Sequence, residues 1–391
     1  MWSRYTHDAL ILAQCTDASA EDLARRQQYP ERLAPVVSDR VCNWYLPVFD
    51  NPFYGGLMTI FRLADHMQRE FGIASRFLIC GPTDTSRTRE SIGSTFASLS
   101  GSSVIALDTP TATANVPFAD YSVATLWTTA YVLLGVKNAG LKFYLVQDFE
   151  PLFYPAGSTY AQAELTYRFG FYGIANTQSL KDIYENTYGG RAVVLDPCID
   201  TSIFYPDESL RPRSPRRLFY YARPGVPRNC FELAANALKL LKERRGDAIE
   251  IVCAGAQWQP AEYGLHGVVR SIGMLPYAQT GDLYRSCHAG LALMMTKHPS
   301  YLPFEMMGCG AIVVANQNDA NTWLLRDRVN SLVSPPTATC LAENLDFALS
   351  DAPELEAIRA AALETIRGRH GDWSRSLDVV CRFMLAVGGD E

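Results

Sequence analysis

The chain has 391 residues, of which 48% are hydrophobic and 19% charged, which is too long for one compact core and typical of two packed domains. Its formal net charge of -6 argues against a nucleic-acid partner, because a broad phosphate-binding surface needs a clustered basic excess. The 10 cysteines are scattered without a CxxC pair or a Cys/His metal spacing, so we interpret them as buried thiols of a reduced, cytoplasmic protein.

Residues 1–40 are interpreted as an N-terminal appendage to the globular domains. Their apolar patch is broken by Gln14 and is too short for a signal sequence or a spanning helix. A helix is expected at residues 20–28, and Pro30 and Pro35 interrupt regular structure. Aromatic and basic residues are spread over this segment, so peripheral contact with the inner face of the plasma membrane stays open. Whether this segment belongs to a larger protein with a neighbouring module also stays open.

The first globular domain is predicted at residues 41–212, as alternating strands and helices. An apolar and aromatic run at residues 41–48 has strand length and ends in a turn that contains Gly55 and Gly56. Apolar residues then recur at the spacing of one helix face, and residues 74–80 form the next strand. This βαβ unit implies a parallel sheet. Further strands are predicted at residues 121–127, 142–147, 172–176 and 193–195.

A second set of alternating elements is predicted at residues 213–372, after a polar, proline-rich segment. A helix with Asn229 as its expected cap follows the first of these strands. The last helix is expected to cross back to the first domain, so residues 373–391 are assigned there. The predicted fold class is α/β, with two doubly wound domains facing across a cleft. The strands of the second domain are predicted at residues 218–222, 249–253, 268–272, 290–295 and 311–315.

The candidate sites lie in loops after strands, because ligands in doubly wound sheets bind beyond the carboxyl ends of the strands. Gly55 and Gly56 open a helix where backbone N–H groups can approach an anion; the alternative is that they only close a tight turn. Arg223 and Arg228 share one strand-to-helix loop and suit a diphosphate, with solvated loop arginines as the alternative.

Three carboxylates are further candidates. Asp148 and Glu150 follow a strand, where they could bind sugar hydroxyls or take a proton from an acceptor; the alternative is that they cap the local turn. Glu305 stands alone among apolar residues, and burial of a lone acid is costly unless it meets a polar partner such as a sugar hydroxyl. His298 lies in the loop before it. The chain contains no GxGxxG and no P-loop motif, which weakens dehydrogenase and P-loop functions.

Five motifs in their usual order resemble the GT-B glycosyltransferases of glycosyltransferase family four, over about residues 41–387. They are the glycine pair after the first strand, CIDTSIFYP, ARPGVPRNCFEL, SIGMLP and PSYLPFEMMGCGAIVVAN. Three segments are more narrowly similar to bacterial rhamnosyltransferases that build surface polysaccharides such as O-antigen: QDFEPLFYP, YRFGFYGIANT and HPSYLPFEM.

The resemblance implies a GT-B fold of two Rossmann-like domains and a hexosyltransferase. The enzyme would move L-rhamnose from a dTDP-linked donor onto a growing glycan or lipid-linked glycan, with retention and without a metal or other cofactor. It implies that the arginine pair holds the donor diphosphate and supplies the main catalytic electrostatic effect. The donor-binding residues that it assigns are Gly55, Gly56, Arg223, Arg228, Gly273, Met274, Leu275, His298, Tyr301, Leu302 and Glu305.

These residues divide by the part of the donor that each would contact. The resemblance assigns the base to residues 273–275, the diphosphate or sugar to Tyr301 and Leu302, and the ribose hydroxyls to Glu305. The glycine pair would lie where the donor phosphate meets the acceptor.

The sequence departs from the family pattern at one position of the donor site. Lys297 stands where the family often has a glutamate, eight positions before Glu305, and His298 or backbone groups are the candidates to replace it. Three other functions stay open: a GT-B epimerase, a catalytically inactive GT-B scaffold and a two-lobed sugar-binding protein.

Overall fold

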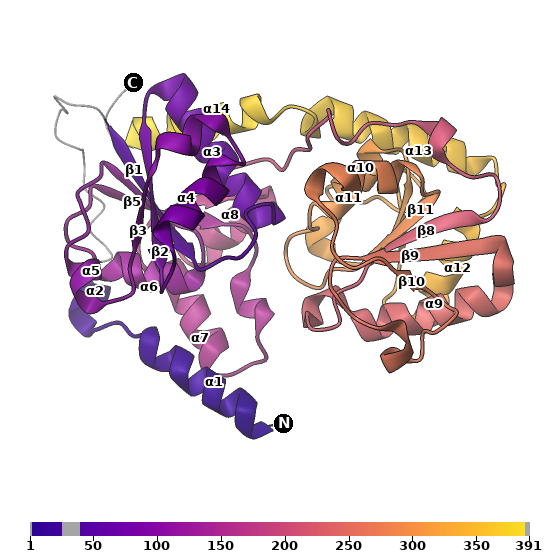
Figure 1. The fold of residues 1–391 in the computed structure, drawn as a ribbon, viewed down its shortest axis with the longest axis horizontal. Coiled ribbons are helices and arrows are strands. Elements are labelled where there is room, and N and C mark those ends of the chain that lie inside the picture. Colours follow the sequence, from indigo (N-terminus) through magenta and orange to yellow (C-terminus); the bar gives the residue numbers. More distant parts are fainter. Residues whose placement is uncertain (1, 26–39, 388–391) are drawn as a thin grey trace. The chain divides into compact units, whose positions relative to one another are not determined.

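The computed structural model describes residues 2–25 and 40–387 (Figure 1). The end of the helix expected at residues 20–28, together with Pro30 and Pro35, lies outside the described residues. The chain divides into two compact units. Unit 1 comprises Met1–Asp196 and Ser374–Glu391, and unit 2 comprises Pro197–Trp373.

Unit 1 is built on a seven-stranded parallel sheet with the order β3-β2-β1-β4-β5-β6-β7. Its strands are β1 (Val41–Pro47), β2 (Ala74–Cys80), β3 (Ser103–Ala106), β4 (Tyr121–Ala124), β5 (Leu141–Val146), β6 (Tyr172–Ala175) and β7 (Arg191–Val194). The connecting helices are α3 (Gly55–Phe71), α4 (Thr85–Gly93), α5 (Pro110–Ala114), α6 (Trp127–Gly135), α7 (Ser158–Leu165) and α8 (Gln178–Asp182). The sequence predicted six of these seven strands and their parallel βαβ connections, and it missed β3.

Helices cover both faces of this sheet because alternate strand residues point to opposite sides. Tyr45 and Tyr144 pack into a core cluster with residues of α6 such as Trp127. On the other face, Phe77 of β2 meets Phe61 of α3 with ring centroids 5.6 Å apart.

The last helix, α14 (Trp373–Val387), returns to unit 1 as the sequence predicted. His66 Nε2 of α3 lies 2.7 Å from Asp378 Oδ1 of α14. Phe383 of α14 and Tyr172 of β6 form an edge-on aromatic contact, with ring centroids 6.1 Å apart. Contacts with α3 and β6 therefore fix α14 to unit 1.

The N-terminal segment contains two helices, α1 (Trp2–Cys15) and α2 (Ala20–Arg25). The sequence did not predict α1. Gln162 of α7 donates hydrogen bonds from Nε2 to the carbonyls of Ala13 and Thr16, at 3.4 and 3.1 Å. The described part of the segment interpreted as an appendage therefore packs on unit 1.

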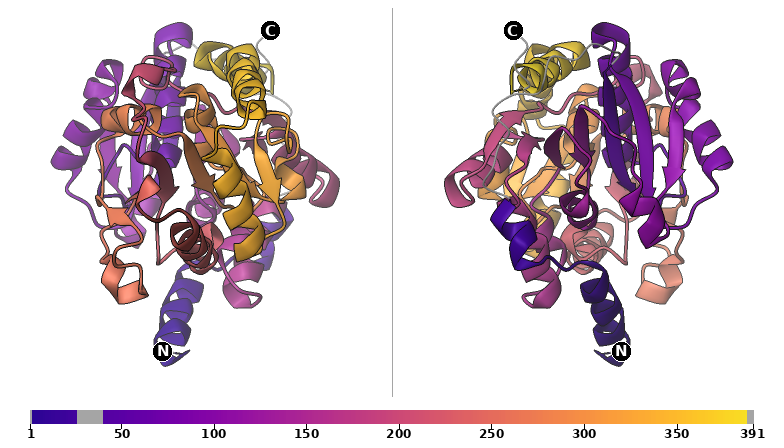
Figure 2. Two further views of the ribbon diagram at one scale, coloured as in Figure 1. Left: turned by 90° about the vertical axis from the view of Figure 1, so that its right-hand side faces the viewer. Right: turned by 90° about the vertical axis from the view of Figure 1, so that its left-hand side faces the viewer.

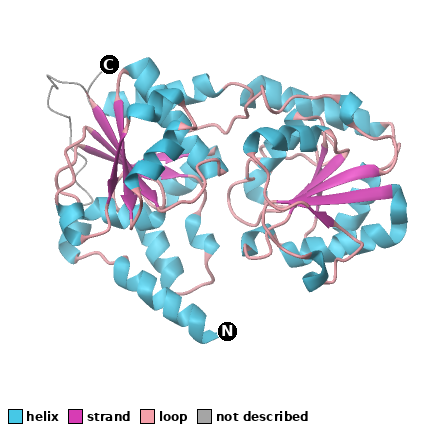
Figure 3. Cartoon of the chain, in the orientation of Figure 1, coloured by secondary structure: helices cyan, strands magenta, loops and turns pink. Residues whose placement is uncertain are grey.

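Unit 2 has a six-stranded parallel sheet with the order β10-β9-β8-β11-β12-β13. Its strands are β8 (Arg216–Tyr221), β9 (Ile249–Ala254), β10 (Arg270–Ser271), β11 (Ala289–Ala292), β12 (Ile312–Asn316) and β13 (Leu332–Ser334). Its helices are α9 (Phe231–Arg245), α10 (Tyr277–Arg285), α11 (Leu302–Gly308), α12 (Ala338–Ala348) and α13 (Glu354–Thr365). Within each unit, helices lie on both faces of the sheet (Figure 2, Figure 3).

The boundary drawn from composition, between residues 212 and 213, lies inside unit 2. The proline-rich segment before it carries Ile199 and Phe204, which are 3% and 1% exposed in a core cluster of unit 2. The ring of Phe204 stacks on Tyr284 of α10 at a centroid distance of 5.9 Å. Polar composition suggested a linker, but these two apolar side chains anchor the segment to unit 2.

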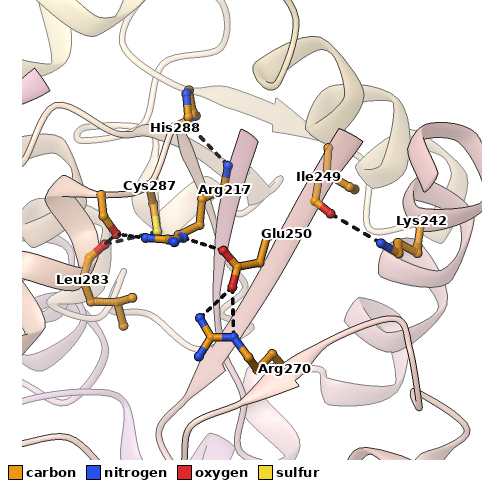
Figure 4. Close-up of polar contacts among 9 residues, drawn as sticks. Arg217, Lys242, Ile249, Glu250, Arg270, Leu283, Cys287 and His288 are labelled. Carbon is orange, nitrogen blue, oxygen red and sulfur yellow. Dashed lines mark hydrogen bonds and ion pairs between the residues drawn. The ribbon is translucent and has the colours of Figure 1, made fainter. Parts of the chain in front are cut away.

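A network of charged side chains lies at the amino-terminal edge of the unit 2 sheet (Figure 4). Glu250 accepts from Arg217 Nε at 2.8 Å through one oxygen and from Arg270 through the other. The backbone N–H of Arg217 donates to Nδ1 of His288 at 3.1 Å. Burial and nearby arginines lower the pKa of His288 to about 4, so it accepts this bond as a neutral ring. The network joins residues of β8, β9, β10 and the segment before β11, and so stabilises this edge of the sheet.

Over residues 2–25 and 40–387, no helix has both the length and the apolar character required to cross a membrane.

The docking of α14 can be tested with two substitutions on the same helix. Met384 is fully buried and Val379 is 50% exposed. We expect Met384→Ala to lower the free energy of unfolding by about 2–5 kcal/mol, through lost burial and a cavity. Val379→Ala should change it by less than about 0.5 kcal/mol. Urea unfolding followed by fluorescence measures both, and equal effects would contradict the packing of α14 on unit 1.

Candidate functional site

The donor-binding residues predicted for the second domain gather at the carboxyl edge of the unit 2 sheet. Arg223 follows β8, residues 273–275 follow β10, and His298 follows β11. Because all the strands are parallel, their carboxyl ends share one edge. β8 and β11 are direct neighbours, with Tyr220 opposite Leu291. The loops after these two strands are therefore adjacent.

A narrow recess lies at this edge, between the ends of β8 and β11. It has room for a group of about the size of one water molecule. Among the residues predicted to bind the donor, Leu302 lines this recess. The other residues that line it were not predicted from the sequence. The lining residues are Tyr221, Asn229, Leu291, Ala292, Leu293, Met294, Pro299, Ser300 and Leu302.

Arg223 and Arg228 place positive charge beside the recess. The Arg223 guanidinium is half-buried and lies 6.0 Å from the ring centroid of Tyr221. Among the described residues, it has no carboxylate partner within ion-pair distance. The carbonyl of Arg228 accepts a hydrogen bond from the N–H of Met295 at 3.2 Å. That bond fastens the arginine loop to the loop after β11.

The helix α9 begins directly after the arginine loop with an open N-terminus. The prediction that Asn229 caps it is wrong: the N-cap residue is Cys230, which has a left-handed φ of 50° and provides no side-chain cap. An uncapped helix N-terminus exposes N–H groups and the positive end of the helix dipole. Together with the arginines, it makes this corner suitable for an anion.

Gly273, after β10, holds a conformation that favours glycine. Its φ is 70°, and a Cβ would lie 2.3 Å from Gln257 Oε1. Its carbonyl accepts a hydrogen bond from the N–H of Gly255 at 3.0 Å. Met274 is 46% exposed, whereas Leu275 is partly buried against the core. The turn therefore presents Met274 to solvent at the carboxyl edge, where a flat group could pack on it.

His298 is buried as a neutral ring. Its Nδ1 accepts from the N–H of Ser300 at 3.0 Å, so the ring proton is assigned to Nε2. Burial lowers its pKa to about 3. Lys297 precedes it, half-buried, and adds a third positive charge to the carboxyl edge. The sequence showed Lys297 only as a departure from a family pattern.

Glu305 lies in the first turn of α11, after Tyr301 at the N-cap and Leu302 at the first helical position. The residue is half-buried, and within the described residues its carboxylate makes no hydrogen bond or ion pair. Burial raises its pKa to about 8. In the protein alone it is therefore mainly protonated at neutral pH, and it can exchange hydrogen bonds with a hydroxyl-bearing ligand.

In unit 1, Gly55 and Gly56 are the first residues of α3. The N-cap residue Tyr54 provides no side-chain cap, and both glycines are exposed. A Cβ on Gly56 would lie 3.2 Å from Oε1 of Gln147, which follows β5. The glycines therefore form the N-terminus of α3, and the missing Cβ of Gly56 allows Gln147 to approach closely.

Glu150 and Asp148, predicted as catalytic residues, are both buried and accept hydrogen bonds from the backbone. It is 2% exposed, and its Oε2 accepts from the N–H of Trp127 at 2.6 Å, which caps the start of α6. Asp148 is 9% exposed, and its Oδ1 accepts from the N–H of Phe149 at 2.7 Å. Both carboxylates therefore accept backbone hydrogen bonds, as the alternative of turn and helix capping expects.

Two parallel sheets with helices on both faces, each with loops for a ligand at the carboxyl edge, define the GT-B glycosyltransferase fold. Residues 43–179 match the family model of the WsaF N-terminal domain, and residues 216–346 match that of the WsaF C-terminal domain. The two matches follow the order of the two units along the chain.

The chain is also similar to individual known proteins. It is 40% identical over 368 residues to the O-antigen biosynthesis protein RfbC of Myxococcus xanthus; the match covers 93% of this chain and 28% of that relative. The chain therefore spans just over a quarter of the length of this relative.

Two solved structures illustrate the likeness of fold. HepE of Anabaena, in complex with UDP and glucose, has a TM-score of 0.69 at 14% identity, over 89% of this chain and 100% of that one. Sucrose-phosphate synthase of Thermosynechococcus elongatus has a TM-score of 0.67 at 12% identity, over 89% and 99%. At these identities the likeness establishes the fold alone.

The raised pKa of Glu305 predicts how stability depends on pH. Between about pH 4.5 and 8 the folded protein keeps a proton that the unfolded chain releases, so stability falls as the pH rises through this range and stays low above it. Glu305→Gln removes the titrating group. We expect the variant to melt at the same temperature as the wild type near pH 4.5 and higher at pH 8, by roughly 2–4 °C per kcal/mol.

Melting temperatures from pH 4.5 to 9 measure this difference. Glu364→Gln, at an exposed position of α13, is the control and should follow the wild type throughout. A Glu305→Gln variant that loses stability at pH 8 would show that the carboxylate has a stabilising partner.

Proposed function

We propose that the protein is a rhamnosyltransferase that moves L-rhamnose from a dTDP-linked donor onto a growing bacterial surface glycan. One observation carries the proposal: the donor residues assigned to unit 2 converge on the carboxyl edge of one sheet, in a chain that is 40% identical to an O-antigen biosynthesis protein over 368 residues. The order of the WsaF domain matches supports it.

In this proposal, Arg223, Arg228 and the open N-terminus of α9 bind the donor diphosphate. Their positive charge stabilises the negative charge that develops on the diphosphate as the bond to the sugar breaks. Met274 packs on the base, and Glu305 exchanges hydrogen bonds with the ribose hydroxyls. The neutral donor His298 Nε2–H or Lys297 takes the place of the family glutamate.

The transfer proceeds on one face of the sugar. The acceptor hydroxyl oxygen bonds to the anomeric carbon as the bond from that carbon to the diphosphate oxygen breaks. The hydroxyl proton passes to the leaving diphosphate, so a strong protein base is not required and the anomeric configuration is retained. Asp148 and Glu150 are proposed to act on the acceptor, and Gly55 and Gly56 to contact the donor phosphate.

The partners proposed are a nucleotide-sugar donor and a glycan or lipid-linked glycan acceptor. RfbC is much longer than this chain, which supports a neighbouring glycosyltransferase module as a partner. Work at the cytoplasmic face of the plasma membrane would bring the protein to a lipid-linked acceptor.

Substitution of the anion-binding and ribose-binding residues tests the assignment. We expect Arg223→Ala and Glu305→Ala each to lower the rate of transfer tenfold or more, which corresponds to about 1.4 kcal/mol of transition-state stabilisation. Arg270→Ala is the matched control, because this arginine pairs with Glu250 at the opposite edge of the same sheet. Sugar transfer measured with dTDP-L-rhamnose decides the question, and wild-type rates in both site variants would refute the assignment.

The identity of the nucleotide is tested separately by melting temperature. We expect dTDP to stabilise the wild type more than UDP or GDP do, since a ligand that binds only the folded state raises stability by mass action. Transfer should be unchanged when EDTA is added. Binding without transfer to any glycan acceptor would favour an inactive GT-B scaffold.

A further inference from the structure

One polar side chain of unit 2 lines the recess and bonds to none of the residues that the structure describes. Asn229 is 6% exposed and lines the recess. Its side-chain amide makes no hydrogen bond with any of the described residues, although its backbone N–H donates to the carbonyl of Val226 at 3.0 Å. Neither amide atom is among the fully enclosed side-chain atoms that lack a partner. The amide is therefore open toward the recess and suited to a partner from outside the chain.

Other buried asparagines of unit 2 differ in this respect. Asn316 donates to the carbonyl of Met294 at 3.1 Å and accepts from its N–H at 2.9 Å. Asn330 donates to the carbonyl of Leu324 and accepts from the N–H of Arg326, both at 2.9 Å. Each of these amides ties two segments together, whereas the amide of Asn229 ties none. A structural role in the fold therefore does not account for Asn229.

Ser300 is a second polar residue of the same recess. It has a left-handed φ of 67°, a conformation that glycine adopts at lower cost than any residue with a Cβ. Within the described residues its hydroxyl makes no hydrogen bond; only its N–H is used, toward His298. Strained residues of this kind cluster at functional sites, and here the strain keeps a hydroxyl in the wall of the recess.

The chemistry of the two side chains identifies the ligand group. The amide of Asn229 and the hydroxyl of Ser300 both donate and accept hydrogen bonds. The ionised diphosphate of a nucleotide sugar only accepts, so it cannot satisfy the amide oxygen, whereas a sugar hydroxyl can donate to it. The recess has room for a group of about this size.

We propose that Asn229 and Ser300 bind one hydroxyl group of the donor sugar and thereby help to determine which sugar the site accepts. The proposal rests on the proposed function, because it requires a nucleotide-sugar donor at the carboxyl edge of unit 2. A site built to hydrogen-bond a substrate hydroxyl discriminates strongly against an analogue that lacks it.

Calorimetric titration of dTDP and of dTDP-L-rhamnose separates the sugar from the nucleotide. We expect Asn229→Ala and Ser300→Ala to bind dTDP as the wild type does and dTDP-L-rhamnose about tenfold more weakly. Ser300→Ala keeps the Cβ and its backbone strain, so any loss reports on the hydroxyl. Ser300→Gly should lose the same affinity for the sugar nucleotide and melt at a higher temperature than Ser300→Ala.

Melting without ligand supplies the structural control. Asn229→Ala breaks no hydrogen bond among the described residues and should melt near the wild type, whereas Asn330→Ala breaks four and should melt lower. A drop for Asn229→Ala as large as that for Asn330→Ala would overturn the proposal.

The titrations can contradict the proposal in other ways. An equal loss of affinity for dTDP and dTDP-L-rhamnose would assign Asn229 to the diphosphate. No loss of affinity for either ligand would mean that the recess holds only water. A wild type that binds none of dTDP, UDP and GDP would instead refute the proposed function, and this inference with it.

Discussion

The site depends on one constraint, the parallel alignment of the six strands of unit 2. Parallel strands end at the same edge, so short loops that are far apart in the sequence are brought together there. The pairing of β8 with β11 places the arginine loop beside the loop that contains Lys297, and the bond from the Met295 N–H to the Arg228 carbonyl fixes that contact. A loss of this register would separate the positive charges from the α11 segment.

The edge keeps polar groups that the fold itself does not satisfy. Glu305 has a carboxylate whose pKa burial raises to about 8, and α9 begins without a side-chain cap. Asn229 and Ser300 add an amide and a hydroxyl without partners among the described residues. Each of these groups costs stability in the free protein. Their concentration at one edge is the pattern expected where a ligand supplies the missing hydrogen bonds.

The opposite edge of the same sheet shows the contrasting arrangement. There Glu250 pairs with two arginines, and His288 accepts a hydrogen bond from the chain (Figure 4). Unit 1 contains a similar case, since Glu150 is used to cap α6. A carboxylate at the end of a strand is therefore informative only when its hydrogen-bond partners are known, which is why the sequence assigned Glu150 and Glu305 the same kind of role and the structure separates them.

The sequence by itself determined the elements whose signal is local. The bounds of β2 and the extent of α14 agree with periodicity, because one apolar face over many residues specifies an element without reference to its neighbours. It missed the short strands β3 and β13, of four and three residues, and it placed the domain boundary too late. Only the tertiary structure decided which polar groups are partnered, because bonds such as the one from the Trp127 N–H to Glu150 join segments distant in sequence. For the same reason, no local pattern could show that the Asn229 amide bonds to none of the described residues.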